Sequence, residues 1–79
     1  MSDVRVDEQL WMTSMLPEGF VERWFVDDGA WVRVGERIAE VRVEGCSHEI
    51  IATDSGRLKI WSPRNSVIEP GSRIGVLER

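Results

Sequence analysis

Gly35-Glu36-Arg37-Ile38-Ala39 is followed 36 residues later by Gly71-Ser72-Arg73-Ile74-Gly75, which keeps the glycine, the arginine and the isoleucine in register. Trp31-Val32 falls on Val67-Ile68 at the same shift. A repeat of this length constrains the whole fold. Here it indicates that the chain contains one structural unit twice.

The repeat extends upstream with a small change of spacing. Gly19 falls on Gly56 and Trp24 falls on Trp61, both at a shift of 37 residues. We attribute the one-residue difference to a shorter loop in the second half. Neither half alone can bury its apolar face, so two similar sheets related by approximate two-fold symmetry are expected. The two halves are predicted to occupy about residues 19–43 and 56–77.

Short segments rich in β-branched and aromatic residues alternate with turn-forming residues along the chain. Segments of this kind favour strands, and evenly spaced turns favour a sandwich or a barrel. Residues 9–17 are apolar without clear periodicity, so we expect a covering loop there, or a single helical turn. The predicted turns include Asp27-Asp28-Gly29, Glu44-Gly45, Asp54-Ser55-Gly56 and Pro70-Gly71.

The composition is that of one soluble globular domain, residues 1–79. The chain has a net charge of −4 and a sequence pI near 4.9, which argues against nucleic-acid binding. No apolar run reaches the roughly 18 residues of a membrane-spanning helix, and no signal-peptide pattern is present. Cys46 is the only cysteine, so no internal disulfide can form. We therefore expect a cytoplasmic protein that does not contact a membrane.

Four segments carry a resemblance to a known family when they are taken in order. They are Gly19-Phe20-Val21-Glu22-Arg23-Trp24, Asp28-Gly29-Ala30-Trp31-Val32, Gly35-Glu36-Arg37-Ile38-Ala39-Glu40-Val41 and Glu49-Ile50-Ile51-Ala52-Thr53-Asp54-Ser55-Gly56-Arg57-Leu58. The closing segment, residues 71–76, continues the resemblance. Together they resemble the biotinyl/lipoyl carrier domains, with the lipoyl type closer. The resemblance runs from about Val4 to Leu77. It implies an all-β flattened barrel, or sandwich, of two four-stranded antiparallel sheets.

The resemblance also implies that a lysine at one hairpin tip carries lipoate or biotin on a swinging arm. In this chain Gly45 occupies the expected acceptor position, within the tip Glu44-Gly45-Cys46. Both cofactors are attached through an amide to a lysine amine, and glycine offers none. Lys59, the only lysine, lies in the other half of the repeat. No cofactor is therefore expected, unless this register is wrong.

Two other functions remain open. The chain could be a genuine lipoyl or biotinyl carrier that is modified at an unexpected site. It could instead be a thiol-dependent enzyme or sensor at Cys46, since His48 lies two residues away and would project to the same face of a strand. A surface metal site formed by Glu44, Cys46 and His48 is disfavoured, because one short hairpin supplies three ligands at most.

The four tryptophans divide into two pairs by position. Trp24 and Trp61 occupy equivalent places in the repeat, which favours a structural role, whereas Trp11 and Trp31 lie in or beside loops. An exposed tryptophan can anchor a protein partner, so Trp11 and Trp31 are candidate contact residues.

The preferred hypothesis is a non-enzymatic, unmodified interaction or assembly module. By analogy with the family, its partner would be an acyltransferase or carboxylase complex, such as a 2-oxoacid dehydrogenase or carboxylase system. No catalytic, cofactor-binding or metal-binding residue is assigned.

Overall fold

The structure is a computed structural model that describes residues 1–12 and 18–79. Within these residues it contains one short 3-10 helix and eight strands. In chain order they are β1 (Ser2–Arg5), η1 (Glu8–Trp11), β2 (Gly19–Trp24), β3 (Trp31–Val32), β4 (Arg37–Val43), β5 (Cys46–Ile51), β6 (Gly56–Ile60), β7 (Val67–Ile68) and β8 (Arg73–Glu78).

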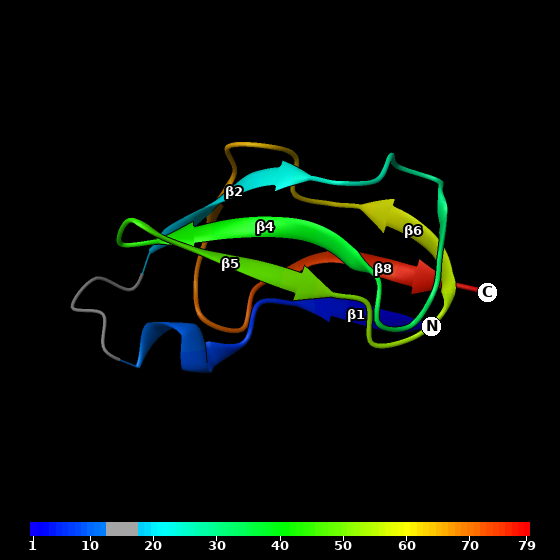
Figure 1. Cartoon of the computed structure of the whole chain (residues 1–79), viewed down its shortest axis with the longest axis horizontal. Helices are drawn as coiled ribbons and strands as arrows, with labels where there is room; N and C mark the ends of the chain where they lie inside the picture. The colour runs from blue at the N-terminus through cyan, green and yellow to red at the C-terminus, as the bar shows by residue number, and fades with distance from the viewer. Residues whose placement is uncertain (13–17) are drawn as a thin grey trace.

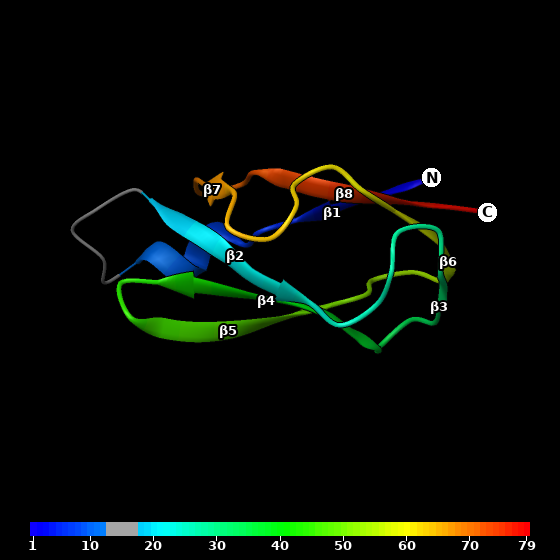
Figure 2. The same cartoon turned by 90° about the horizontal axis from the view of Figure 1, so that it is seen from above.

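The strands form two four-stranded antiparallel sheets. One has the order β1-β8-β6-β3 and the other the order β5-β4-β2-β7. Figures 1 and 2 show the two layers and place both termini at the end of the molecule opposite the β4–β5 hairpin. The predicted all-β sandwich with two four-stranded sheets is confirmed. The predicted covering segment begins with η1, a single helical turn, and residues 13–17 lie outside the described part of the chain.

The two sheets are copies of each other. Replacing β1, β8, β6 and β3 by β5, β4, β2 and β7 converts one strand order into the other. Backbone hydrogen bonds repeat in the same way: the Phe25 N–H donates to the Ile38 carbonyl and the Trp61 N–H donates to the Ile74 carbonyl, both at 2.9 Å. The predicted internal two-fold repeat is therefore present in the backbone itself.

The change of spacing within the repeat has a different cause from the one expected. Strand β2 carries a bulge against β4: Val21 pairs with Val41, Arg23 pairs with Glu40, and Glu22 is left over. Strand β6 pairs with β8 without such a break. A bulge inserts one residue into a strand, so Glu22, and not a loop, accounts for the shift from 37 to 36 residues.

The bulge also changes which aromatic residues correspond. Trp24 pairs with Ala39, while the residue opposite Gly75, the equivalent of Ala39, is Ile60. The interpretation of Trp24 and Trp61 as equivalents was therefore wrong by one residue.

Phe25 is the true counterpart of Trp61. An arginine at equivalent positions lies over each ring: the Arg37 guanidinium carbon is 5.5 Å from the Phe25 centroid and that of Arg73 is 5.2 Å from the Trp61 centroid. Cation–π contacts of this length are favourable. The repeat thus extends from the backbone to this pair of side-chain contacts.

The core lies between the inner faces of the two sheets, as expected for a sandwich. Trp11 of η1 belongs to it and is only 7% exposed, so the expectation that Trp11 is available to a partner was wrong. Trp24 packs against the core and its Nε1 donates to the Ser62 carbonyl at 2.8 Å. The largest fully buried side chains are Val6, Val21, Val32, Ile38, Val41, Leu58, Ile68, Ile74 and Leu77.

Candidate functional site

The β4–β5 hairpin contains Gly45, the position at which the sequence resemblance implies an acceptor lysine. Val43 pairs with Cys46, so the turn consists of two residues, Glu44 and Gly45. Their φ angles are 48° and 81°. A two-residue turn with positive φ at both positions matches the twist of the flanking strands, and Gly at the second position favours it. The sequence prediction of a hairpin turn at Glu44-Gly45 is confirmed.

Position 45 faces open space. A Cβ atom built on Gly45 would meet no other atom within 4 Å. Lys59, in contrast, is an exposed residue of β6 that pairs with Val76 of β8, in the other sheet. Figure 1 shows the hairpin loop at one end of the molecule and β6 toward the other. The only amine-bearing side chain therefore lies on a different element from the hairpin tip.

A polar network joins the hairpin to the bulge of β2. One oxygen of the Glu22 carboxylate accepts from the Arg42 guanidinium at 2.9 Å and the other accepts from the Ser47 hydroxyl at 3.0 Å. The hydrogen bond from Arg42, followed by that from Ser47, holds the pKa of Glu22 below its ordinary value. Arg42 also donates to the Gly45 carbonyl at 3.4 Å, a long contact. These bonds fix the hairpin against β2.

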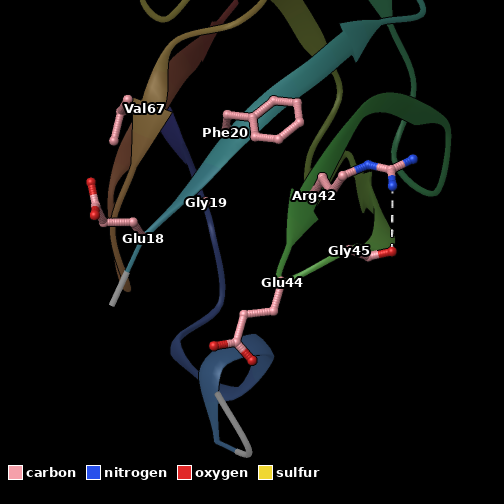
Figure 3. A pocket seen from close by; sticks show the side chains of 7 residues that line it. All are labelled: Glu18, Gly19, Phe20, Arg42, Glu44, Gly45 and Val67. Atoms are coloured by element: carbon pink, nitrogen blue, oxygen red, sulfur yellow. Dashed lines mark hydrogen bonds between the residues drawn. The ribbon is translucent and has the colours of Figure 1, made fainter. Parts of the chain in front are cut away.

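Beside this network lies a shallow open recess of about 320 Å³. Figure 3 shows its lining, with Phe20 and Val67 on one side and the hairpin turn on the other. Phe20 of β2 and Val67 of β7 form a cross-strand pair and are 37% and 67% exposed. None of Glu22, Arg42, Phe20 and Val67 was among the site residues predicted from the sequence. The only sequence signal for Glu22 was the change of spacing in the repeat.

Cys46 and His48, the two residues considered for thiol chemistry, both lie on β5. They share a face of β5, opposite Val43 and Val41, as their spacing predicts. Cys46 is exposed, and no hydrogen bond links it to His48 in the part of the chain that the structure describes. Nucleophilic catalysis needs a base within hydrogen-bond reach of the thiol. Residues 1–12 and 18–79 also contain no cluster of three or more side chains that could hold a metal ion.

Of the two tryptophans proposed as partner contacts, Trp31 has the required exposure. It lies on β3, at the edge of its sheet, and is 57% exposed. No helix among the described residues is long and apolar enough to cross a membrane.

Comparison with solved structures shows that this fold occurs in a known protein domain. The solved lipoyl domain of the 2-oxoglutarate dehydrogenase complex from Azotobacter vinelandii superposes with a TM-score of 0.79, over 100% of this chain and 98% of that one. The two sequences are 19% identical. No family model and no curated protein matches the sequence. The chain is therefore a protein with the lipoyl-domain fold.

Proposed function

We propose that this chain is an unmodified lipoyl-type domain that acts as a non-enzymatic interaction or assembly module. The observation that supports it is the hairpin tip, where Glu44 and Gly45 form the whole turn and no side chain offers an amine. The fold supplies the scaffold of a carrier, but the atom that would be acylated is missing. Without an acylated lysine, we expect a domain of this fold to act through noncovalent contacts of its surface.

The absence of a modified lysine is tested by the intact mass of the protein purified from its own host. We expect the plain polypeptide mass, apart from methionine processing. The same preparation treated with lipoate ligase and with biotin ligase should not gain mass. A lipoyl or biotinyl increment on Lys59, or on any other residue, would restore the carrier function and contradict this proposal.

The role in assembly is tested by the size of the native particle. The solved neighbour comes from a 2-oxoglutarate dehydrogenase complex, and we propose that the partner here is likewise a 2-oxoacid dehydrogenase or carboxylase system. On size-exclusion chromatography of a gentle native extract, the chain should elute with that assembly and dissociate from it at high salt. Elution as a free 9.0 kDa protein would argue against an assembly role.

A further inference from the structure

The outer faces of the two sheets differ in charge although the backbones are copies. On the β1-β8-β6-β3 sheet, side chains alternate between the core and the outside, so the neighbours of the buried Leu58 on β6 project outward. These neighbours are Arg57 and Lys59. Along the four strands, the outward charged residues are the cations Arg5, Arg57, Lys59 and Arg73 and the anions Asp3 and Glu78. This face is net positive on a chain whose net charge is −4.

On the β5-β4-β2-β7 sheet, the arginines of the outer face all have carboxylate partners. The ion pairs join Arg23 to Glu40 at 3.3 Å, Arg37 to Glu49 at 2.6 Å and Arg42 to Glu22 at 2.9 Å. That face therefore neutralises itself.

On the β1-β8-β6-β3 sheet, only some of the outward cations have carboxylate partners. Arg5 and Arg73 of the same sheet share Asp3, at 3.2 and 3.7 Å. Neither Arg57 nor Lys59 forms an ion pair among the residues that the structure describes, although Glu78 lies opposite Arg57. The one hydrogen bond of the Arg57 side chain goes to the Gly29 carbonyl. Arg57 and Lys59 are thus two exposed cations without a direct ion pair, and Glu78, opposite Arg57, offsets only part of their charge.

An exposed tryptophan adjoins these cations. Trp31 of β3 pairs directly with Arg57 of β6, so the two side chains stand next to each other on the outer face. Trp31 is 57% exposed, a large apolar area for a surface residue. Val76, the cross-strand neighbour of Lys59, is only 4% exposed yet lies outside the core cluster. The outer face is therefore packed at its centre and open at Trp31.

We propose that Trp31, Arg57 and Lys59 form a docking surface for an acidic segment of a protein partner. Tryptophan and arginine are the residue types that dominate binding energy at interfaces, and complementary charge selects the partner. A nucleic acid would offer the same negative charge, but its phosphates would extend beyond this small patch. There they would meet the rest of an acidic chain, which repels them. This inference rests on the proposed interaction role and assigns it a surface and a partner chemistry.

The test is a nuclear magnetic resonance titration of the ¹⁵N-labelled protein with decaglutamate, decalysine and oligothymidylate. Decaglutamate should shift the Trp31 indole signal and the amides of β3 and β6, and added salt should reverse these shifts. Decalysine should leave those signals unchanged. Shifts confined to the β4–β5 hairpin, no shifts at all, or tighter binding of oligothymidylate than of decaglutamate would each overturn the proposal.

Variants provide matched controls. Arg57→Gln with Lys59→Gln, and separately Trp31→Ala, should each weaken decaglutamate binding by about tenfold. Arg23→Gln with Arg64→Gln changes the net charge equally at exposed residues away from the β1-β8-β6-β3 sheet, and should leave affinity within about twofold. Val67→Ala is the control for Trp31, because Val67 is its repeat counterpart on β7 and is 67% exposed. If test and control variants weaken decaglutamate binding equally, binding does not depend on these particular residues. That result would refute the proposed docking surface.

The two proposals fail separately. A lipoylated or biotinylated protein with an intact Trp31 surface would refute the unmodified state alone. An unmodified protein that joins its native assembly but ignores decaglutamate would refute the docking surface alone.

Discussion

Gly45 combines open space with a backbone conformation that side chains resist. A Cβ there meets nothing within 4 Å, but φ is 81°, in the left-handed region. A side chain at such an angle costs about 1 kcal/mol. Glu44 already tolerates a φ of 48° with a side chain present. The two turn positions therefore differ in how easily they accept a lysine.

The register at the tip is tested by Gly45→Lys. We expect the variant to fold with a free energy of unfolding lower by about 1 kcal/mol, and to present an exposed amine flanked by Glu44 and Cys46. The sequence resemblance implies a tip nearer to the lipoyl than to the biotinyl type, so lipoate ligase should modify the variant at least partly and biotin ligase poorly. Urea unfolding and intact mass after ligase treatment measure the two effects.

Glu44→Lys and Cys46→Lys are the controls for this register. If Gly45→Lys folds and stays unmodified while either control is modified, the alignment of the tip is off by one residue. If none of the three accepts lipoate, the fold is lipoyl-like but its tip is not recognised as an acceptor site.

At the scale of elements, the equivalent strands β2 and β6 each begin with a glycine that the neighbouring strand approaches closely. A Cβ on Gly19 would lie 2.6 Å from the Arg42 carbonyl oxygen, and one on Gly56 would lie 2.7 Å from that of Glu78. Both distances are shorter than van der Waals contact, and both obstacles are backbone atoms. Steric need at two symmetric positions explains why this glycine recurs in the repeat.

Alanine substitutions should rank accordingly. We expect Gly19→Ala and Gly56→Ala to lower the free energy of unfolding by about 2–3 kcal/mol, because a paired strand must move. Gly35→Ala should cost only about 1 kcal/mol, since its site is open and only its φ of 90° is unfavourable. Chemical denaturation of the three variants gives the ranking. A smaller loss for Gly19→Ala than for Gly35→Ala would contradict the close approach.

At the scale of the whole molecule, Asp54 ties together three distant parts of the chain. Its carboxylate accepts from Arg79 at 2.8 Å, from the Ser55 backbone N–H at 2.8 Å and from the Ser2 hydroxyl at 3.0 Å. The hydrogen bond from Arg79 contributes most, followed by those from Ser55 and Ser2. Together they lower the pKa of Asp54 from 3.8 to about 2. The ends of the chain are thereby held to the loop between β5 and β6.

This lowered pKa predicts how stability depends on pH. Because the folded pKa lies below the unfolded one, the contribution is fully present above pH 3.8 and is lost as the pH falls toward 2. Asp54→Asn should lower the urea midpoint at pH 7 and remove part of the decline between pH 4 and pH 2. Asp27→Asn, at an exposed aspartate, should leave the curve of the native protein unchanged. A parallel acid decline in the native and Asp54→Asn proteins would disprove the link.

Much of the molecule followed from local pattern. The two-residue turn at Glu44-Gly45 was predicted because positive φ and glycine go together. The strand after it begins at Cys46, because a turn of only two residues pairs Val43 with the third residue after it. The local sequence pattern located the turn, whereas the pairing of β4 with β5 determined the first residue of β5.

The sequence alone determined the repeat, the all-β class and the absence of an amine at residues 44–46, since spacing, apolar alternation and residue identity are local properties. Only the tertiary structure decided the rest: the bulge at Glu22, the burial of Trp11 and the lack of ion pairs at Arg57 and Lys59. Each of these depends on residues from remote segments that lie side by side only in the folded chain. Cross-strand pairing between remote segments is fixed by the packing of the whole sandwich, so no local stretch of sequence encodes it.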